Sequence, residues 1–400
     1  MIKIFFSFLT NWPGRVFIKR ILKKKIIFSE LKQYDLLIID EGWSNLDFEH
    51  ICSFKVIKNE IYFNCLLRAF LKSLSFIGKK YRYSLANLYL QELVKKTKPK
   101  VIIGHDFRES IFSIKKHFPQ IFTIIYQFSD HDILNKKVLS QAIGPNLNLD
   151  EFRCDLYLSK HEAFNSLVDF IKAKFLIVGS VKNNEMIMKD SDKKIYDIMM
   201  VSQYRRDTYS FKGIYNPKMT HVKDSALIYV TNILSSYCEK KNKKLCIART
   251  SSRKEKQDHT NKSDEVEFFS KTLNSKKFYV EDIDSYQLSN KSKLIVTTYS
   301  TIGLELLSRG KRVLFIDPFH FLGGHIVNML TKEAEGPHWY CGNDPSVIEN
   351  KIDYLLSISD REWEDVVKKS PLKMEYDPGN KRLKELVKNK INDQKFDRLN

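Results

Sequence analysis

Residues 293–317 read KLIVTTYSTIGLELLSRGKRVLFID, and this stretch decides the fold of the chain. Lys293–Thr298 is apolar and β-branched, which is typical of a parallel strand that is covered on both faces. A short helix is predicted to follow and to end at Gly310, and Val313–Ile316 is predicted to be the next buried strand. A strand, a helix and a second strand in succession indicate an α/β fold with a parallel sheet.

The start of the predicted helix has the residues expected of a phosphate site. Ser300 and Thr301 place hydroxyl groups at its first turn, and Gly303 allows neighbouring backbones to pack closely. The N-terminus of a helix at the carboxyl edge of a parallel sheet favours a bound anion. Glu305, one turn further on, is predicted to accept hydrogen bonds from sugar hydroxyls. The stretch therefore indicates the nucleotide-binding half of an enzyme.

The chain has 400 residues, a length that predicts two domains rather than one core. Short apolar runs alternate with helical patterns in both halves, and a polar stretch at residues 182–194 interrupts the alternation. We predict an N-terminal α/β domain over 1–181, a linker over 182–194, a C-terminal α/β domain over 195–375 and a basic helical tail over 376–400. The predicted architecture is two Rossmann-like domains with parallel sheets that face a central cleft.

Local patterns extend this prediction to individual elements. Ser159 is predicted to be the N-cap of a helix at His161–Lys172, with Glu162 completing a capping box. Asp258–Glu265 is polar and is predicted to be a surface insertion. The other predicted strands are Ile2–Phe8, Asp35–Asp40, Val101–Gly104, Phe122–Gln127, Leu156–Leu158, Phe175–Val178, Tyr196–Val201, Leu245–Ala248 and Lys277–Val280.

The formal net charge of +19 suits an anionic partner such as nucleic acid, an anionic membrane or a phosphorylated substrate. The sequence has no zinc-finger spacing, aromatic-rich RNP run or glycine-clamped loop, so nucleic acid is not an expected partner. Arg15–Lys25 can form a basic amphipathic helix. Such a helix can lie on an anionic membrane surface or can be an ordinary surface helix, and the sequence favours neither.

Three features bear on the compartment. No apolar run approaches the roughly 20 residues that span a bilayer. The opening segment lacks a small-residue cleavage site, which favours a first strand over a signal peptide. The six cysteines are scattered without a C-x-x-C pair, so free thiols in a reducing compartment are expected. The sequence therefore predicts a cytoplasmic protein, either fully soluble or peripheral at the inner face of the cell membrane.

The order of segments in the second half resembles the donor-binding domain of GT-B glycosyltransferases, and more narrowly the bacterial transferases of surface-carbohydrate and capsule biosynthesis. DIMMVSQYR, residues 197–205, resembles the first strand and phosphate-facing loop of that domain. CIARTSSR, residues 246–253, resembles the strand followed by a basic residue that faces the donor phosphates. Residues 278–317 resemble the segment that holds the nucleotide, and FLIVGSVKNN, residues 175–184, resembles the last strand of the acceptor domain.

The resemblance implies that the C-terminal domain binds a nucleotide-sugar donor and that the N-terminal domain holds a glycan or lipid-linked glycan acceptor. Ser300 and Thr301 would then hold the donor phosphate, and Glu305 would contact ribose or sugar hydroxyls. Ser202 falls in the phosphate-facing loop, and Arg249 would neutralise the charge that develops on the leaving nucleotide. The donor-binding set also includes Gly303, which opens the helix.

Asp282 and Asp284 have the D-x-D form with which some glycosyltransferases of a different fold hold a divalent metal. In the resemblance this turn faces the nucleotide, so a contact from Asp282 to the base or ribose, or a helix cap, is favoured over a metal site. No metal and no cofactor are predicted, because the nucleotide-sugar is a substrate. Related transferases that use cytidine-linked sugars have a His-Pro pair that this chain lacks, so the base of the donor stays open.

Polar residues that follow the predicted strands of the first half are the candidates for acid–base catalysis. Asp130 and His131 follow Phe122–Gln127 and are our first choice for the base that deprotonates the acceptor. His105 and Asp106 follow another strand and are the second pair. The first pair can instead be a helix N-cap with a solvated histidine, and the second pair can instead cap a helix that begins near Arg108.

The predicted function is a glycosyltransferase that builds surface polysaccharide, such as capsule or lipopolysaccharide, from a hexosyl or ulosonic-acid donor that the sequence does not resolve. Two alternatives keep the same fold but change the reaction: a polyol-phosphate transferase and a nucleotide-sugar epimerase. A third alternative is a non-catalytic basic protein that binds a membrane or nucleic acid.

Overall fold

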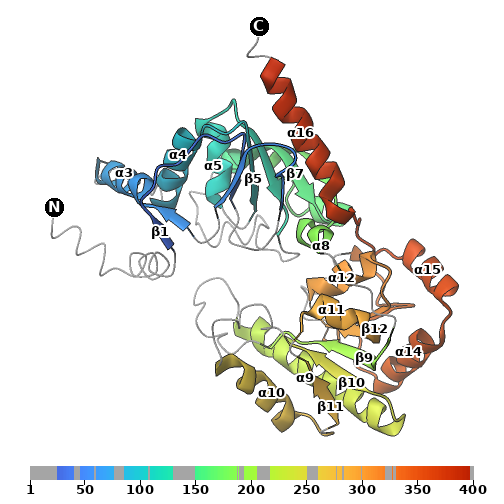
Figure 1. Ribbon diagram of the computed structural model, residues 1–400. Coiled ribbons are helices and arrows are strands. Elements are labelled where there is room, and N and C mark those ends of the chain that lie inside the picture. Colours follow the sequence, from blue (N-terminus) through green and yellow to red (C-terminus); the bar gives the residue numbers. More distant parts are fainter. Residues whose placement is uncertain are drawn as a thin grey trace.

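The computed structural model contains two α/β units that follow one another along the chain (Figure 1). The residues that the structure describes are 25–39, 46–57, 60–75, 85–106, 109–128, 149–186, 188, 193–204, 217–249, 260–275, 277–281, 283–298, 300–319, 327 and 330–396.

The N-terminal unit is built on a six-stranded parallel sheet with the strand order β3-β2-β5-β6-β7-β8. The strand order reverses between β2 and β5, which are neighbours in the sheet although β3 and β4 lie between them in the sequence. A separate parallel pair joins β1 (Lys25–Ile27) to β4 (Glu60–Tyr62). The six strands of the main sheet are β2 (Leu36–Ile39), β3 (Phe54–Ile57), β5 (Val101–His105), β6 (Phe122–Tyr126), β7 (Arg153–Ser159) and β8 (Lys172–Ile177).

Both faces of this sheet are covered, which explains why its central strands are apolar throughout. Alternate residues of β2 enter different cores, as the two-residue period of a strand requires: Leu37 and Ile39 face one side, and Leu36 and Ile38 face the other. The first core is completed by α3 (Phe63–Ser75), α4 (Leu85–Thr97) and α5 (Glu109–His117).

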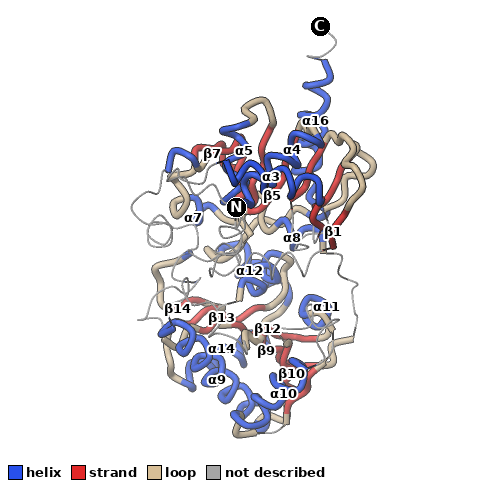
Figure 2. The backbone as a smooth tube through the Cα atoms, turned by 90° about the vertical axis from the view of Figure 1, so that its left-hand side faces the viewer, coloured by secondary structure: helices blue, strands red, loops and turns tan. Residues whose placement is uncertain are grey.

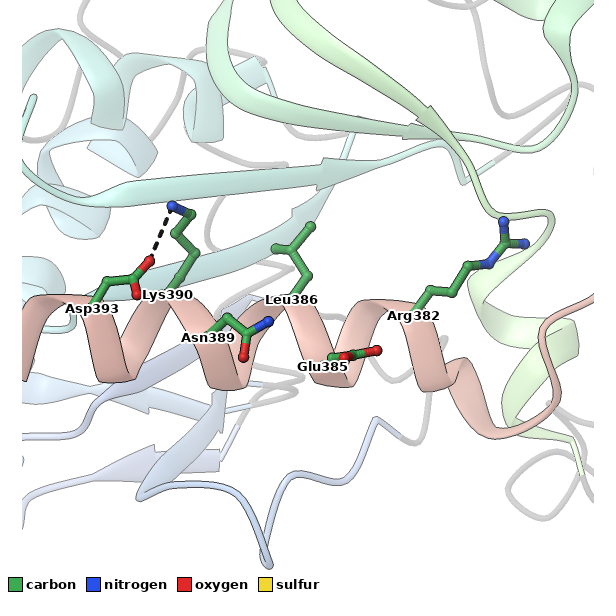
Figure 3. A pocket seen from close by; sticks show the side chains of 6 residues that line it. All are labelled: Arg382, Glu385, Leu386, Asn389, Lys390 and Asp393. Carbon is green, nitrogen blue, oxygen red and sulfur yellow. Dashed lines mark hydrogen bonds and ion pairs between the residues drawn. The ribbon is translucent and has the colours of Figure 1, made fainter.

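The second core of the N-terminal unit is completed by the last helix of the chain, α16 (Lys381–Phe396). Leu383, Val387 and Ile391 recur every four residues and are at most 2% exposed. The chain therefore returns from the C-terminal unit to cover the N-terminal sheet (Figure 1). An open pocket runs along α16, and Figure 3 shows Leu386 and Lys390 extending from the helix toward that sheet.

The C-terminal unit is built on a seven-stranded sheet with the order β11-β10-β9-β12-β13-β15-β14, parallel except for the last pair. Its strands are β9 (Tyr196–Val201), β10 (Leu245–Ala248), β11 (Phe278–Val280), β12 (Ser292–Thr297), β13 (Val313–Ile316), β14 (Glu335–Gly336) and β15 (Trp339–Tyr340). Its helices include α9 (Pro217–Lys240), α10 (Thr260–Thr272), α11 (Ser285–Asn290), α12 (Thr301–Ser308), α14 (Pro345–Ser357) and α15 (Asp360–Lys369).

The two units are joined by two crossing segments that lie side by side. The first includes α8 (Val181–Glu185), and the second includes the 3₁₀ turn Pro378–Asn380. Asn380 Nδ2 donates to the carbonyl of Val181 at 2.8 Å, so each crossing supports the other. Figures 1 and 2 both place α8 and α12 between the two sheets. Phe164, in the short helix α7 (Glu162–Asn165) of the N-terminal unit, belongs to the core of the C-terminal unit.

Most predicted strands are present, but two local predictions are wrong. The helix predicted over His161–Lys172 ends at Asn165, and its N-cap is His161, not Ser159, because Ser159 is the last residue of β7. The surface insertion predicted over Asp258–Glu265 is wrong as well, because α10 begins at Thr260 and Glu265 is 1% exposed.

Further predictions concern the linker, the N-terminal segment, the cysteines and membrane-spanning helices. The polar stretch 182–194 begins inside α8, where Asn183 and Asn184 are buried. The strand Ile2–Phe8 and residues 15–24 of the basic amphipathic segment lie outside the described residues. None of the six cysteines forms a disulfide bond. Within the described ranges, no helix has the length and apolar character that crossing a bilayer requires.

Candidate active site

Ser300 and Thr301 lie at the carboxyl edge of the C-terminal sheet, because they follow the end of β12 and begin α12. A Cβ atom at Gly303 would lie 2.5 Å from Thr297 Cγ2 and 2.7 Å from Phe315 Cε1, so this position has no room for a side chain. Gly310 follows the helix with a φ of 77°, a conformation that glycine adopts without strain. The packing role predicted for Gly303 and the helix end predicted at Gly310 are confirmed.

The strand order of the C-terminal sheet reverses between β9 and β12. In open α/β sheets, ligands bind outside the carboxyl ends of the strands at such a reversal. Ser202 and Gln203 follow β9, Thr298 follows β12, and Thr298 Oγ1 donates to Gln203 Oε1 at 3.3 Å. Arg249 is 6% exposed and follows β10, which is the strand next to β9. Two of the predicted donor residues, Ser202 and Arg249, therefore lie at adjacent strand ends.

Ser300 and Thr301 lie at the start of α12 and are both half-buried. Ser300 is the N-cap residue in extended conformation, yet its side chain makes no capping hydrogen bond to the helix. Its hydroxyl therefore does not satisfy the backbone N–H groups of the first turn, which are the groups that bind anions at helix N-termini. The two residues lie at the carboxyl edge of the sheet, as the sequence predicted, and this edge is also where the strand order reverses.

Glu305, which was predicted to contact sugar hydroxyls, accepts two hydrogen bonds from side chains of the protein itself. The residue is 4% exposed; Ser180 Oγ donates to Oε1 at 2.5 Å, and the hydroxyl of Tyr286 donates to Oε2. Burial alone would raise the pKa of Glu305, but Lys160, Lys182 and the two hydrogen bonds lower it below its ordinary value. Glu305 is thus an ionised buried carboxylate that joins α12 to the segment between the two units.

His105 and Asp106 lie at the end of β5, where the N-terminal strand order reverses, and both are buried. Tyr157 donates from its hydroxyl to Asp106 Oδ2 at 2.7 Å, and the backbone N–H of Phe128 donates to Oδ1 at 3.1 Å. Burial raises the pKa of Asp106 to about 6, although the hydrogen bonds and Lys160 act in the opposite direction. Asp106 therefore titrates close to neutral pH.

Lys160 is a residue of this region that the sequence prediction missed. It follows β7, is 2% exposed, and donates from Nζ to the carbonyl of Phe128 at 3.0 Å. Its charge lowers the pKa of both Asp106 and Glu305, so one ammonium group acts on carboxylates from both units. The sequence contains a signal for this residue, because the lysine directly follows the strand residues LYLS. A charged residue at the carboxyl end of a parallel strand lies at the edge of the sheet where ligands bind.

The remaining predicted residues divide into two groups. Asp130, His131 and Asp282 lie outside the described residues. Asp284, the partner of Asp282 in the D-x-D pattern, is the N-cap of α11 and accepts from the backbone N–H of Tyr286 at 2.9 Å. Across the described part of the chain, no three His, Cys, Asp or Glu side chains are grouped so that they could hold a metal ion.

The carboxyl edges of the two sheets therefore approach each other near α12. Asp106 and Lys160 come from strand ends of the N-terminal sheet, and Glu305 comes from α12, which begins at the carboxyl end of β12. Ser180 Oγ, on the crossing segment, bonds directly to Glu305. Ser202 and Arg249 lie along the same edge of the C-terminal sheet, one and two strands away from β12.

Two Rossmann-like units with largely parallel sheets define the GT-B fold, and comparison with solved structures agrees with this assignment. S. aureus MnaA in complex with UDP matches with a TM-score of 0.52 and 14% identity, over 92% of this chain and 97% of that chain. The UDP-GlcNAc 2-epimerase from Neisseria meningitidis bound to UDP-GlcNAc matches with a TM-score of 0.53 and 14% identity, over 89% of this chain and 99% of that chain.

Residues 150–391, more than half of the chain, match a protein family described as "putative O-antigen biosynthesis protein". The chain belongs to this family of O-antigen biosynthesis proteins. No curated protein sequence matches the chain. The matched region begins just before β7, continues through the whole C-terminal sheet and ends within α16, so it includes Lys160, Ser180 and Glu305.

Proposed function

We propose that this protein is a glycosyltransferase that moves a sugar from a nucleotide-sugar donor to a surface polysaccharide or lipid-linked glycan acceptor. The observation on which the proposal rests is the reversal of strand order between β9 and β12, with a helix N-terminus and hydroxyl side chains at that point. Membership in an O-antigen biosynthesis family supports an acceptor that is a surface glycan.

On the donor side, Ser300 and Thr301 bind the donor phosphate together with the first-turn N–H groups of α12. Arg249 and Ser202, at the ends of β10 and β9, neutralise and orient the leaving nucleotide, because its departure concentrates negative charge on phosphate oxygens. Glu305 contributes by holding α12 in place, since both its carboxylate oxygens already accept hydrogen bonds from Ser180 and Tyr286.

On the acceptor side, the base that deprotonates the acceptor hydroxyl comes from the carboxyl ends of β5 and β6. His105 ends β5, and Asp130 and His131 follow Phe128 along the chain by two and three residues. Asp106 accepts a hydrogen bond from the backbone N–H of Phe128 and so fixes the position of Phe128, the last described residue before Asp130 and His131. A carboxyl group with a pKa near 6 is also suited to accept a proton near neutral pH.

An epimerase acting on a nucleotide-sugar is the second candidate. It is favoured by the likeness to the Neisseria UDP-GlcNAc 2-epimerase, which extends over nearly the full length of both chains. An epimerase needs the same donor site but no acceptor, so the two candidates differ in whether a second substrate is consumed.

The test has two stages and uses the full chain. A thermal-shift screen with UDP, CDP, GDP, TDP and their sugar derivatives is expected to identify one stabilising nucleotide, with about 2.7 kcal/mol of added stability at 100 times the dissociation constant. The sugar derivative of that nucleotide is then incubated with and without a panel of lipid-linked mono- and disaccharides, and the products are analysed by mass spectrometry and NMR.

Release of the nucleotide that depends on a lipid-linked acceptor would support the transferase. Formation of an isomeric nucleotide-sugar without any acceptor would support the epimerase instead. Absence of stabilisation by every nucleotide would contradict both candidates and would favour a non-catalytic protein.

A further inference from the structure

The outer face of α3 is apolar although it does not face the core. Cys65 and Ala69 are buried on the inner face, where Cys65 joins the core that contains Leu93 of α4. On the opposite face, Phe63, Leu67 and Leu71 recur every four residues and are 38%, 43% and 56% exposed. A helix with apolar residues on two opposite faces needs a partner for the second face.

Neighbouring residues extend this apolar face into a patch. Phe28, just after β1, is 69% exposed, and its ring centre lies 5.1 Å from that of Phe63. Ile26 in β1 is 40% exposed. Within the described part of the chain, five of the eight large apolar side chains that are exposed fall in this patch, which we name the α3 patch: Ile26, Phe28, Phe63, Leu67 and Leu71. Such clustering marks an interaction surface, whereas scattered exposed residues do not.

A basic pocket lies directly beside the α3 patch. Arg68 lines this pocket and follows Leu67 on the same helix, and Glu92 is its one acidic residue, where it pairs with Lys72 and Lys95. The lining contains five cationic side chains, which together exceed the charge of that carboxylate. The residues of the basic pocket are Leu31, Lys32, Gln33, Arg68, Glu92, Lys95, Lys96 and Lys98.

We propose that the α3 patch and the basic pocket form a docking surface for an anionic lipid bilayer. Apolar side chains flanked by cationic groups fit a surface where acyl chains lie beneath phosphate headgroups. The helix has 13 residues, too short to span a bilayer, so α3 would lie in the plane of the interface. Figure 1 shows α3 at the outer edge of the N-terminal unit, on the side away from α8 and α12.

Charge argues for a bilayer and against a second copy of the chain as the partner. A symmetric contact through the α3 patch would place the same surface of both copies together, and the two basic pockets would approach each other. Like charges brought together in this way disfavour association. An anionic bilayer instead complements the pocket, and the formal net charge of +19 strengthens the attraction.

This proposal does not depend on the proposed reaction, and its test uses the full chain in vesicle sedimentation. Wild type is expected to bind vesicles of phosphatidylglycerol and phosphatidylethanolamine at least ten times more tightly than vesicles of phosphatidylcholine alone. Lys95→Gln with Lys96→Gln should weaken this binding about 25-fold, at about fivefold for each charge removed. Leu67→Gln with Leu71→Gln should also weaken it and should leave only binding that is lost at high salt.

Matched controls are available on the C-terminal unit. Lys368 and Lys369 are adjacent exposed lysines in the last turn of α15, as Lys95 and Lys96 are in α4, and their replacement by Gln should leave vesicle binding unchanged. Ile195→Gln and Tyr354→Gln are the apolar controls, at 38% and 43% exposure. Equal binding to both vesicle types, or wild-type binding by both the Lys95 and Lys96 variant and the Leu67 and Leu71 variant, would overturn the proposal. A change of oligomeric state in the Leu67 and Leu71 variant, with vesicle binding intact, would show that a second copy covers the patch.

Discussion

Ser180 Oγ donates a hydrogen bond of 2.5 Å to Glu305 Oε1, and this bond links the segment between the two units to the helix that starts at the candidate donor site. Asn183, three residues further along the segment, donates from Nδ2 to the backbone carbonyl of Glu305 at 3.3 Å. The guanidinium of Arg309, at the end of the same helix, donates to Asn183 Oδ1 at 2.7 Å. The position of α12 is therefore set by the crossing segment as well as by its own sheet.

This arrangement predicts that Glu305 matters for stability. Glu305→Ala would leave the hydroxyls of Ser180 and Tyr286 buried without their acceptor and should lower the free energy of unfolding by about 3 kcal/mol. Glu281→Ala is the control, because Glu281 also accepts from a tyrosine, Tyr196, but is only half-buried. It should cost about 1 kcal/mol or less. Urea unfolding measures both changes.

The contrary outcome would be as informative. If Glu305→Ala kept wild-type stability and lost only nucleotide binding, Glu305 would contact the ribose or sugar hydroxyls, as the family resemblance implies. The structural role that its two hydrogen bonds indicate would then be wrong.

Ser300 and Thr301 should show the opposite pattern from Glu305. Because both are half-buried and Ser300 makes no capping bond, Ser300→Ala with Thr301→Ala should change the unfolding midpoint little. Binding of the nucleotide that stabilises the wild type should weaken about tenfold or more, because hydrogen bonds to a charged phosphate are lost. Calorimetric titration measures the affinity.

Ser359 provides the matched serine for this experiment. It is the N-cap of α15 and forms a complete capping box with Glu362. Ser359→Ala should therefore lower stability by about 1 kcal/mol and leave nucleotide affinity unchanged. Unchanged affinity in the Ser300 and Thr301 variant would reject the proposed donor site.

The C-terminal sheet could be predicted closely from sequence because its strands are buried on both faces. Tyr196–Val201 and Leu245–Ala248 have the predicted bounds, and Ser292–Thr297 is displaced by one residue. Continuous apolar runs between turn residues leave few alternatives. β3 was missed, because Phe54–Ile57 contains a lysine and forms an edge of its sheet, where three of its four residues are only partly buried.

Contacts between residues that are far apart in the sequence determine the features that local patterns did not predict. Ser159 and Glu162 match a capping box, yet Ser159 is held in β7 by β8, since the backbone N–H of Val178 donates to its carbonyl. The contacts that define the junction are also remote in sequence: Ser180 and Glu305 are 125 residues apart, and Asp106 and Tyr157 are 51 apart. Periodicity predicts which face of an element is buried but not which distant side chain it meets.

Gly303 tests how closely α12 must approach its sheet. Gly303→Ala should lower the free energy of unfolding by about 1–3 kcal/mol, because the added methyl group would overlap Thr297 and Phe315. Gly310→Ala separates this effect from backbone strain: its Cβ would meet nothing within 4 Å, but its φ is 77°. It should cost about 1 kcal/mol, and Gly310→Asn should recover part of this cost. An undiminished unfolding free energy for Gly303→Ala would contradict the close approach.

The raised pKa of Asp106 predicts a pH dependence of stability. Between its ordinary pKa of 3.8 and its value of about 6 in the folded chain, the folded state binds more protons at this site than the unfolded state. The free energy of unfolding should therefore fall as pH rises through this window, by at most about 3 kcal/mol from this group. Asp106→Asn removes the effect, so the stability of wild type minus that of the variant should decrease from pH 4 to pH 7. Asp344→Asn is the control: the hydrogen bonds from Ser346 lower the pKa of Asp344 below its ordinary value, so its contribution changes only at about pH 4 and below, and the difference between wild type and this variant should stay nearly constant from pH 4 to pH 7. Urea unfolding at constant ionic strength measures both series, and parallel curves for wild type and Asp106→Asn would show that Asp106 does not titrate in this range.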